Sequence, residues 1–474
     1  MLAGLQCFAV SFLSELTFFL GDFMIFRRGL QYTASMGLGL KRGSNKAKDM
    51  RFFLIRFDEV GGTFYLISSL TEKAISVLKR FRKFVATTLM ISLFAFSTQA
   101  ADVIKIGQVA PKSGPLAGGA AVTQWPNVEL WSKQVNARGG LNVGGKKMLV
   151  EIIEYDDKTN PGEHIKAAQR LAQVDKVDFI IAPYGTGFNL AAAPIYAKYG
   201  YPHIGVSVIS DKMPELTARY KNMFFTLGNT SSFTGSVIDI LKDMRAAGTI
   251  GKRVAMVNVA DAFGIELAGA ARPRMKEAGF EIVYDKSYPL GTPDLSPIIK
   301  GAKNSNPDAF VAWSYPPDTF GLTEQAIIQD LDVKMYYTAV ATCFPAFKGK
   351  FGSKIEGVFG AGGVNQDSPK IQEYFKAHKE ITGKVADGWA SANTYVSLEI
   401  LAQAIEGAGT LDRASVTEYI KNNTFDTIMG PINFENQISN KYWTVGQWQG
   451  GKFRGVKSSQ MDGAAPIVAK DGWN

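Results

Sequence analysis

The sequence predicts an α/β protein made of two Rossmann-like lobes, each a parallel β-sheet covered by helices. From Ala101 onward, short apolar runs alternate with segments of helical period, which is typical of repeated strand–helix–strand units. About ten strands are expected, more than one sheet comfortably holds, and the segment 222–232 interrupts the alternation. Ligands bind such sheets at the carboxyl ends of the strands, so two facing lobes would enclose a cleft.

The elements of the first lobe follow one another from residue 102. Gly139-Gly140 is a helix-ending signal, and Pro161 is favoured in the first turn of a helix. Strands are expected at 102–111, 147–157, 178–183 and 202–208, and helices at 127–138, 161–173 and 189–200.

The same alternation restarts after the interruption. Helices are expected at 231–248, 266–279, 294–305 and 321–331, and strands at 253–260, 281–289, 308–316 and 334–341.

The first hundred residues have a different character. The segment 1–78 shows no sustained period and does not read as a domain, so we interpret it as a misassigned or disordered extension. Residues 79–100 have the order of a secretory signal: a basic cluster, a 13-residue apolar run from Phe84 to Phe96, then small residues ending at Ala100. Cleavage there predicts a mature chain that starts at Ala101. A retained N-terminal membrane anchor is the alternative.

Charge and cysteine content exclude several classes of function. Residues 1–100 hold 13 Lys and Arg against 6 Asp and Glu, whereas the remaining 374 hold 39 against 37. The body therefore lacks the basic surface of a nucleic-acid-binding protein. Of the two cysteines only Cys343 follows the expected cleavage site, so no internal disulfide is expected there. No Cys/His cluster has metal-ligand spacing, and no cofactor is expected.

Several motifs together resemble a known family. They are "DVIKIGQVAPKSGPLAGGA", "QVNARGGLNVGGKKMLVEIIEYDDKTNP", "ADAFGIELA" and "DTIMGPINFE", preceded by the export signal. In this order they resemble the leucine/isoleucine/valine-binding proteins, the type I periplasmic solute-binding proteins of ABC importers. The resemblance implies two lobes joined by three hinge crossings. It implies a first lobe of 101–225 plus 341–431 and a second of 226–340 plus 432–474 with the tail.

The resemblance also carries site residues to this chain. In "PYGTGFN", Thr186 matches the hydroxyl residue that binds the ligand carboxylate, at a helix N-terminus suited to an anion. Ser207 and Ser210 match a second loop of the first lobe. In the second lobe, Phe263 and Tyr315 match aromatic residues that contact the ligand.

A departure from the family pattern points to the class of ligand. The acidic residue that holds the α-amino group in amino-acid binders corresponds here to Val340, and "MYYTAVATCF" contains no carboxylate. A buried ammonium without a counter-charge is strongly penalised. The aromatic residues expected nearby are Tyr184, Phe188, Trp313, Tyr315, Phe344 and Trp389. We therefore expect an apolar or aromatic carboxylate rather than a branched-chain amino acid; if an amino acid does bind, Asp261 or Asp318 would hold its amine. The family's disulfide is absent, because Thr159 and Gly185 stand at its positions.

Three functions compete at this point. The first is a periplasmic solute-binding protein that closes on a small molecule and delivers it to permease subunits in the inner membrane, acting as a monomer. An enzyme is disfavoured, because "VAPKSGPLAG" lacks the dinucleotide-binding glycine spacing and no G-x-S-x-G turn occurs. The third is the ligand-binding ectodomain of a membrane-anchored sensor.

Overall fold

The computed structural model describes residues 37–40, 51–59, 62–70 and 103–473, in two compact units, 1–99 and 100–474. In the first unit, β1 (Gly37–Leu40), β2 (Arg51–Glu59) and β3 (Gly62–Leu70) form an antiparallel sheet. These strands fall in the segment for which the sequence shows no period. β2 reads "RFFLIRFDE", with apolar residues on both faces, so alternation gives no signal. The expected signal segment 79–100 lies outside the described residues.

The second unit begins with the first lobe, whose sheet has the order β5-β6-β4-β7. β4 pairs in parallel with both β6 and β7, and β8 and β9 form a separate parallel pair. The strands are β4 (Val103–Ala110), β5 (Leu141–Val143), β6 (Lys146–Asp156), β7 (Phe179–Ile180), β8 (His203–Gly205) and β9 (Met223–Phe225). The helices between them are α3 (Ala117–Thr123), α4 (Trp125–Ala137), α5 (Pro161–Arg170), continued by the π-turn η1 (Leu171–Asp175), α6 (Thr186–Lys198) and α7 (Met213–Arg219).

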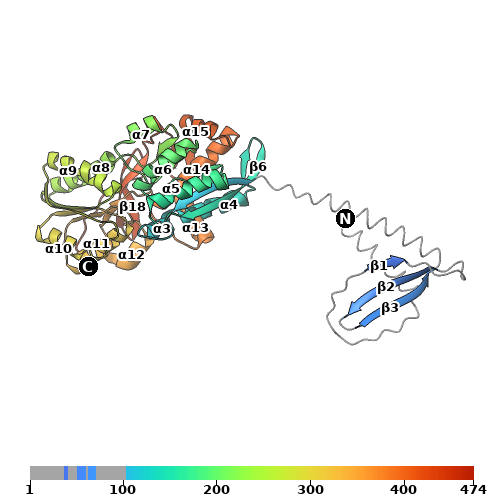
Figure 1. Cartoon of the computed structure of the whole chain (residues 1–474). Helices are drawn as coiled ribbons and strands as arrows, with labels where there is room; N and C mark the ends of the chain where they lie inside the picture. Colours follow the sequence, from blue (N-terminus) through green and yellow to red (C-terminus); the bar gives the residue numbers. More distant parts are fainter. Residues whose placement is uncertain (1–36, 41–50, 60–61, 71–102, 474) are drawn as a thin grey trace. The chain divides into compact units, whose positions relative to one another are not determined.

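A later part of the chain completes this lobe. It consists of α13 (Pro369–Thr382), α14 (Ala390–Ala408), α15 (Arg413–Asn422) and the hairpin β15 (Phe425–Thr427) and β16 (Gly430–Ile432). The apolar face of α14 packs into one buried cluster with β4 and α4. Tyr374 of α13 donates to Asn127 of α4 at 2.6 Å. Figure 1 shows α13–α15 beside α4–α6 at one end of this unit.

The second lobe contains a seven-stranded sheet with the order β11-β10-β12-β13-β14-β17-β18. β10 to β14 are parallel, whereas β17 and β18 add an antiparallel edge. The strands are β10 (Arg253–Val259), β11 (Glu281–Tyr288), β12 (Ala309–Trp313), β13 (Met335–Thr338), β14 (Phe359–Ala361), β17 (Tyr442–Gln449) and β18 (Lys452–Ser459). The helices are α8 (Thr230–Ala246), α9 (Ala262–Glu277), α10 (Ser296–Asn304), α11 (Pro316–Ile328) and α12 (Pro345–Phe351), with the 3₁₀-turn η2 (Gly352–Ile355).

The chain passes three times between the lobes: after β9, after β14 and before β17. The second crossing lies later than expected. The sequence assigned residues from 341 onward to the first lobe, but β14 pairs in parallel with β13, from Tyr337↔Phe359 to Thr338↔Gly360. Residues 341–361 therefore belong to the second lobe, and this crossing falls at 362–368. The three-residue β14 was too short to be recognised from its sequence.

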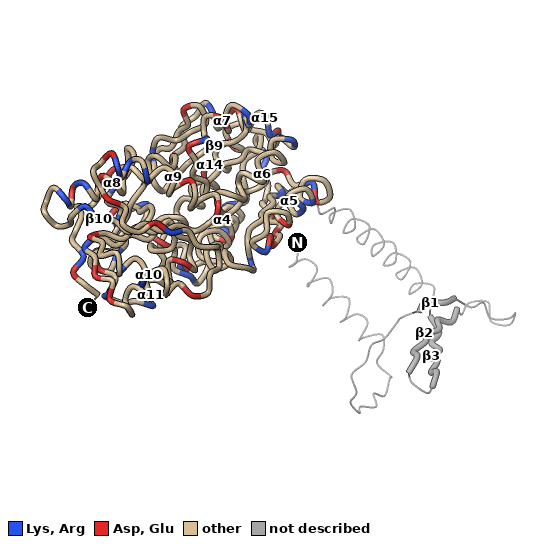
Figure 2. The backbone as a smooth tube through the Cα atoms, turned by 60° about the vertical axis from the view of Figure 1, so that its left-hand side comes forward, with Lys and Arg blue, Asp and Glu red and all other residues tan. Residues whose placement is uncertain are grey.

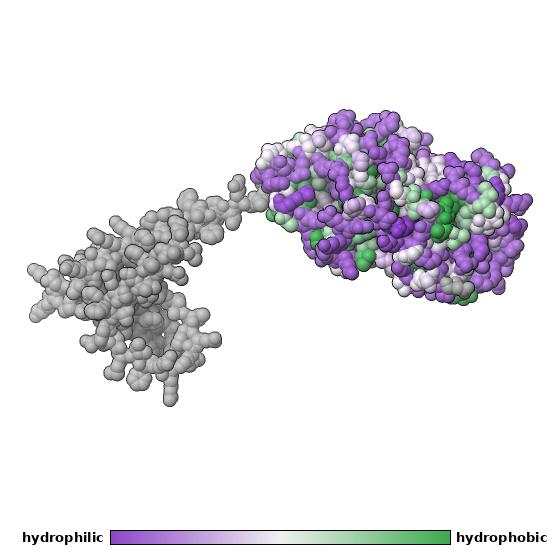
Figure 3. Space-filling model, turned by 180° about the vertical axis from the view of Figure 1, so that it is seen from behind, coloured by the Kyte–Doolittle hydropathy of each residue, from purple (hydrophilic) through white to green (hydrophobic). Residues whose placement is uncertain are grey.

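The surface of the second unit carries charges of both signs in close alternation (Figure 2). The face seen in Figure 3 is mostly hydrophilic, with apolar spots between hydrophilic regions. The exposed large apolar side chains are Leu149, Val174, Ile265, Ile328, Val385 and Val468. Within the described residues, no helix has the length and apolar character needed to cross a bilayer.

Candidate ligand-binding site

Most of the predicted site residues lie in the loops or helix starts that follow the carboxyl ends of parallel strands, where this kind of sheet binds ligands. Thr186 follows β7, and Ser207 follows β8. In the second lobe, Phe263, Tyr315 and Val340 follow β10, β12 and β13.

One buried apolar cluster joins the two lobes at these loops. The first lobe contributes Leu116, Tyr184 and Phe188, and the second contributes Phe263 and Tyr315. Val340, Phe344 and Trp389 belong to the same cluster. The structure thus brings together most of the predicted aromatic residues, with the lobes in contact.

Thr186 is the first residue of α6 and is buried. Gly185 precedes it with a φ of 93°, a conformation that a side chain would strain. The Thr186 Oγ1 accepts a hydrogen bond from the Ile209 backbone N–H at 3.3 Å. The helix begins without a side-chain cap among the described residues. Beyond the Thr186 N–H, which the Tyr315 hydroxyl approaches, the N–H groups of its first turn can face an anion.

The two serines have different surroundings. Ser207 Oγ accepts from the Gly185 N–H at 2.9 Å and donates to the Pro183 carbonyl at 2.7 Å, so it braces the loop before Thr186. Ser210 Oγ accepts from the Lys212 N–H at 3.1 Å, within its own turn. The structure therefore places Ser207 next to Thr186 and gives Ser210 a local role.

Tyr315 connects the lobes. Its ring stacks on Phe263 with centroids 4.9 Å apart and planes at 29°. Its hydroxyl lies in hydrogen-bonding reach of the Asp261 carboxylate and of the Thr186 backbone N–H. Burial, followed by the charge of Asp261, raises the pKa of Tyr315, so the phenol stays protonated and can donate.

Two carboxylates lie beneath Tyr315. Asp261 caps α9 by accepting from the Gly264 N–H at 2.9 Å, and Asp318 accepts from the Tyr315 N–H at 3.1 Å. Burial raises the pKa of Asp261, and burial raises the pKa of Asp318 to about 7, with a further contribution from Asp261. The charge of Asp261 thus makes ionisation of Asp318 less favourable.

Val340 has no charged partner. Its N–H donates to the Ser314 carbonyl at 3.0 Å, and its own carbonyl accepts from Thr319 Oγ1 at 2.5 Å. The side chain lies in the apolar cluster between the lobes. This position offers an ammonium group no counter-charge of its own.

Several buried polar atoms in this cluster have no hydrogen-bond partner among the described residues, and the Tyr184 hydroxyl and the Trp389 indole nitrogen are two of them. Tyr184 is 6% exposed and Trp389 is 4% exposed. Burial, followed by the Asp387 charge, raises the pKa of Tyr184. Unpaired donors at such depth destabilise a protein unless another group satisfies them.

Two glycines let these large side chains fit. A Cβ on Gly119 would lie 2.2 Å from the Tyr184 hydroxyl oxygen, and a Cβ on Gly362 would lie 2.0 Å from the Trp389 ring. Both contacts are far closer than a methyl group tolerates, so only glycine can occupy these two positions without moving the aromatic rings.

Asp387 is a buried residue that the sequence analysis missed. Its carboxylate accepts from the backbone N–H groups of Trp389 and Ala390 at 2.7 Å and of Ser391 at 2.9 Å, which anchors the start of α14. Cys343 Sγ lies 3.4 Å from it. Asp387 lies three residues before α14, outside the N-cap position held by Trp389, so the usual N-cap signal could not have revealed this role.

The remaining predicted aromatic residues are all buried: Phe188, Trp313 and Phe344. Phe188 packs edge-on against His164 with centroids 5.8 Å apart. Trp313 packs edge-on against Tyr337, with centroids 5.4 Å apart. Phe344 is the residue before α12 and is buried.

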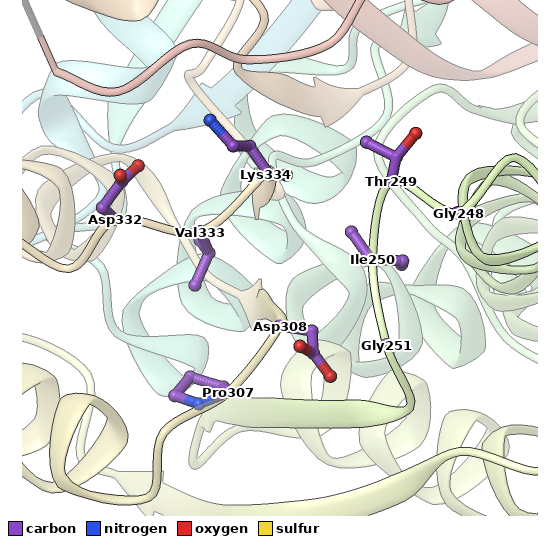
Figure 4. A pocket seen from close by; sticks show the side chains of 9 residues that line it. All are labelled: Gly248, Thr249, Ile250, Gly251, Pro307, Asp308, Asp332, Val333 and Lys334. Atoms are coloured by element: carbon purple, nitrogen blue, oxygen red, sulfur yellow. The ribbon is translucent and has the colours of Figure 1, made fainter.

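An open depression of ≈ 440 Å³ lies elsewhere in the second lobe (Figure 4). It is lined by residues that precede β10, β12 and β13, among them Thr249, Asp308 and Lys334. It therefore lies at the amino ends of the strands, opposite the predicted site. Asp308 is already engaged there by the Arg253 N–H at 2.8 Å. Among the described residues, no group of three or more His, Cys, Asp and Glu could hold a metal ion.

The chain forms two α/β lobes, passes between them three times, and buries an aromatic cluster where strands of both lobes end. This arrangement is that of a hinged ligand-binding protein. Residues 103–452 match the family model described as periplasmic binding protein, and the chain belongs to that family. It is the type I form, with Leu/Ile/Val-binding proteins among its relatives. This family consists of solute-binding proteins rather than enzymes.

Two curated relatives show how far the likeness extends. The "Leu/Ile/Val-binding protein homolog 7" of Brucella suis biovar 1 is 25% identical over 382 residues, covering 76% of this chain and 93% of the relative. The "Leu/Ile/Val-binding protein" of Escherichia coli K12 is 25% identical over 354 residues, covering 72% and 90%.

Solved structures share the fold. A solute-binding protein of an ABC transporter from Rhodopseudomonas palustris BisB5, in complex with 3,4-dihydroxybenzoic acid, has a TM-score of 0.64 at 22% identity, covering 77% of this chain and 98% of that one. A branched-chain amino acid transporter substrate-binding protein from Streptococcus pneumoniae, in complex with isoleucine, has a TM-score of 0.65 at 20% identity, covering 75% and 99%.

Proposed function

We propose that this protein is the periplasmic substrate-binding component of an ABC importer and that it captures a small apolar or aromatic carboxylate. The ligand would be enclosed as the lobes close and would then be delivered to permease subunits in the inner membrane. Closure is favoured because the ligand contacts both lobes only in the closed state. The export signal ending near Ala100 supports a periplasmic location.

The observation that carries the choice of ligand is the pairing of an uncapped helix N-terminus with an apolar position opposite. Thr186 and the first N–H groups of α6 suit a carboxylate. Val340, at the position of the family's amine-binding acid, lies in an aromatic and aliphatic cluster. The carboxylate of an aromatic acid would accept hydrogen bonds at the start of α6, and its ring would pack against the apolar cluster that contains Val340.

A zwitterionic amino acid is the second candidate, because Asp261 and Asp318 lie side by side next to Tyr315. An ammonium group placed between them would offset the burial that raises both pKa values and the charge of Asp261 that adds to the rise at Asp318. Branched-chain ligands would then fill the apolar cluster with their side chains.

Thermal unfolding of the purified protein against a ligand panel separates these candidates. The panel contains benzoate, 4-hydroxybenzoate, short aliphatic acids, leucine, valine and amides of the acids. A ligand present at 100 times its Kd adds about 2.7 kcal/mol of stability. Stabilisation by aromatic acids without any by leucine supports the proposal, and stabilisation by leucine or valine supports the second candidate.

A further inference from the structure

Two fully buried polar side chains lie directly behind the loop that carries Thr186. Asn189, on the first turn of α6, and His203, the first residue of β8, are both 0% exposed. Neither belongs to the aromatic cluster between the lobes, and the proposed function gives them no role.

The contacts of Asn189 fix the orientation of its amide. Its Nδ2 lies 2.9 Å from the carbonyl oxygens of Pro183 and Gly185, which can only accept, so this atom must be the donor. The opposite assignment would place three acceptors together. The Oδ1 atom therefore faces His203 Nε2, 2.8 Å away.

This orientation in turn fixes the tautomer of His203. Because Asn189 Oδ1 is an acceptor, Nε2 of the imidazole must carry the proton. Nδ1 has no partner among the described residues. Burial and the neighbouring His164 lower the pKa of His203 to about 3, and Tyr196 packs against the ring with centroids 4.9 Å apart. The donor role of Nε2 is therefore constant over the physiological pH range.

We infer that the His203–Asn189 pair is a positioning device that holds the 183–186 loop so that the first N–H groups of α6 face the ligand's carboxylate. His203 orients the amide of Asn189, which restrains the carbonyls of Pro183 and Gly185. Ser207 closes the same network, since its Oγ bonds Pro183 and Gly185 and lies 3.4 Å from Asn189 Nδ2. This inference rests on the proposed function.

The network restrains the loop at a turn that only glycine adopts easily. Gly185 has the positive φ that turns the chain from β7 into α6. Bonds to both sides of Gly185 keep this turn in one conformation, so the N–H groups point in a fixed direction before a ligand arrives. Pre-organised donors bind an anion more tightly than donors that must first be ordered.

The test compares the binding of 4-hydroxybenzoate and 4-hydroxybenzamide by isothermal titration calorimetry. The two probes share a ring and a hydroxyl and differ in charge. The ratio of their affinities therefore measures how well Thr186 and the first turn of α6 bind a carboxylate, and it does not depend on the general stability of the protein. His203→Leu removes the donor and should lower this ratio by about tenfold. His203→Gln can still offer an N–H and should keep the ratio near that of the wild-type protein.

A matched control is His378→Leu. His378 is also fully buried, on α13, with Nδ1 2.9 Å from the Lys384 carbonyl. Its replacement should lower the melting temperature without changing the ratio of affinities.

The outcomes distinguish the inference from the function on which it rests. A folded His203→Leu variant that keeps the wild-type ratio would overturn the inference and leave the proposed function standing. If the wild-type protein does not prefer 4-hydroxybenzoate to 4-hydroxybenzamide, both the proposed function and the carboxylate site at Thr186 and the start of α6 are overturned. If His203→Leu does not fold, histidine ¹⁵N shifts of the wild-type protein decide: an Nε2–H ring that does not titrate from pH 5 to 8 supports the inference, and an Nδ1–H or charged ring overturns it.

Discussion

The Tyr184 hydroxyl and the Trp389 indole N–H have no hydrogen-bond partner among the described residues, although both side chains lie deep between the lobes. A ligand with a second polar group at its far end, such as a phenol, would supply the missing acceptor. At the residue scale, these two atoms are the basis for expecting hydroxylated aromatic acids.

Replacing Tyr184 by Phe tests this expectation. The substitution should reduce the preference for 4-hydroxybenzoate over benzoate by about fivefold, since one neutral hydrogen bond contributes about 1 kcal/mol. Affinity for benzoate should remain, because the ring is kept. Tyr337→Phe is the matched control, since its hydroxyl is also buried without a partner among the described residues but lies on β13. An unchanged preference in Tyr184→Phe, measured by calorimetry, would exclude this tyrosine from the site.

Replacing Thr186 by Val tests whether Thr186 and the start of α6 bind the ligand's carboxylate. The isosteric change removes the hydroxyl, and affinity for an aromatic acid should fall by about 10- to 100-fold, because hydrogen bonds to charged groups contribute about 1.5–3 kcal/mol. The control is Thr417→Val on α15, another buried threonine, whose hydroxyl has no partner among the described residues. Calorimetric titration of both variants with 4-hydroxybenzoate is the measurement, and equal affinities would remove Thr186 from the site.

The sequence indicated some of these residues and not others. Thr186, Tyr315 and Phe263 could be placed because the family resemblance carries each to a position shortly after a predicted strand, and the ends of parallel strands meet at one edge of a sheet. Ser210 could not be separated from Ser207, since only the fold shows which serine hydrogen-bonds to Gly185. His203 was expected to be a structural histidine at the start of a strand, but its contact with Asn189 could not be foreseen, because a 14-residue separation gives no sign that the two touch.

At the scale of elements, α15 is attached to the rest of the first lobe through its apolar residues Val416 and Ile420 and through Arg413. Its Nε, Nη1 and Nη2 donate to the carbonyl oxygens of Asp178, Tyr199 and Val177 at 2.7–2.8 Å. The guanidinium also lies 3.9 Å from the centroid of the Tyr201 ring. The planar fork of arginine suits these three acceptors, and a lysine cannot reproduce it.

Arg413→Lys should therefore be a poor substitution. It leaves two carbonyls without a donor, and we expect a loss of about 2–3 kcal/mol in the free energy of unfolding. The control is Arg272→Lys, at a surface pair with Asp285 in which both side chains are at least 35% exposed, where the loss should be under about 1 kcal/mol. Chemical denaturation of both variants is the measurement. A comparable loss in the two would show that α15 is held by its apolar face instead.

Elements with a clear apolar period were predictable from the sequence, whereas very short strands and the antiparallel edge strands were not. The strand starting at Arg253 was placed at its observed first residue, and Pro161 begins α5 as expected. β14 has three residues, and β17 and β18 form an antiparallel edge that the alternation of strands and helices did not foreshadow. Their places are set by pairing with distant strands rather than by local propensity.

At the scale of the whole molecule, stability should depend on pH through buried carboxyl groups in both lobes. Burial raises the pKa of Asp318 to about 7 in the second lobe and that of Glu399 to about 7 in the first. Both folded-state values lie above the unfolded values of about 4. The folded state therefore binds more protons between pH 4 and 7, and these groups lower stability as pH rises through that window. His203 acts in the opposite direction below about pH 6.5, because its folded-state pKa is lowered.

Asp318→Asn isolates one of these contributions. Its amide oxygen can still accept from the Tyr315 N–H but does not ionise. Relative to the wild-type protein, the variant should gain about 2–3 kcal/mol on going from pH 5 to pH 8. Urea denaturation at both pH values measures this difference. Glu277→Gln, an exposed position on α9, is the control. A difference that does not vary with pH would mean that Asp318 has an ordinary pKa.

The three crossings have a consequence for how this chain reaches its folded state. Each lobe is assembled from separated parts of the sequence: Tyr374 bonds Asn127 across 247 positions, and Glu406 bonds the Asn142 N–H across 264. Neither lobe can be finished before the last hundred residues have been synthesised, and contacts of such long range form slowly. If the proposed function holds, this late completion of both lobes suits a chain that is exported through a membrane before it folds.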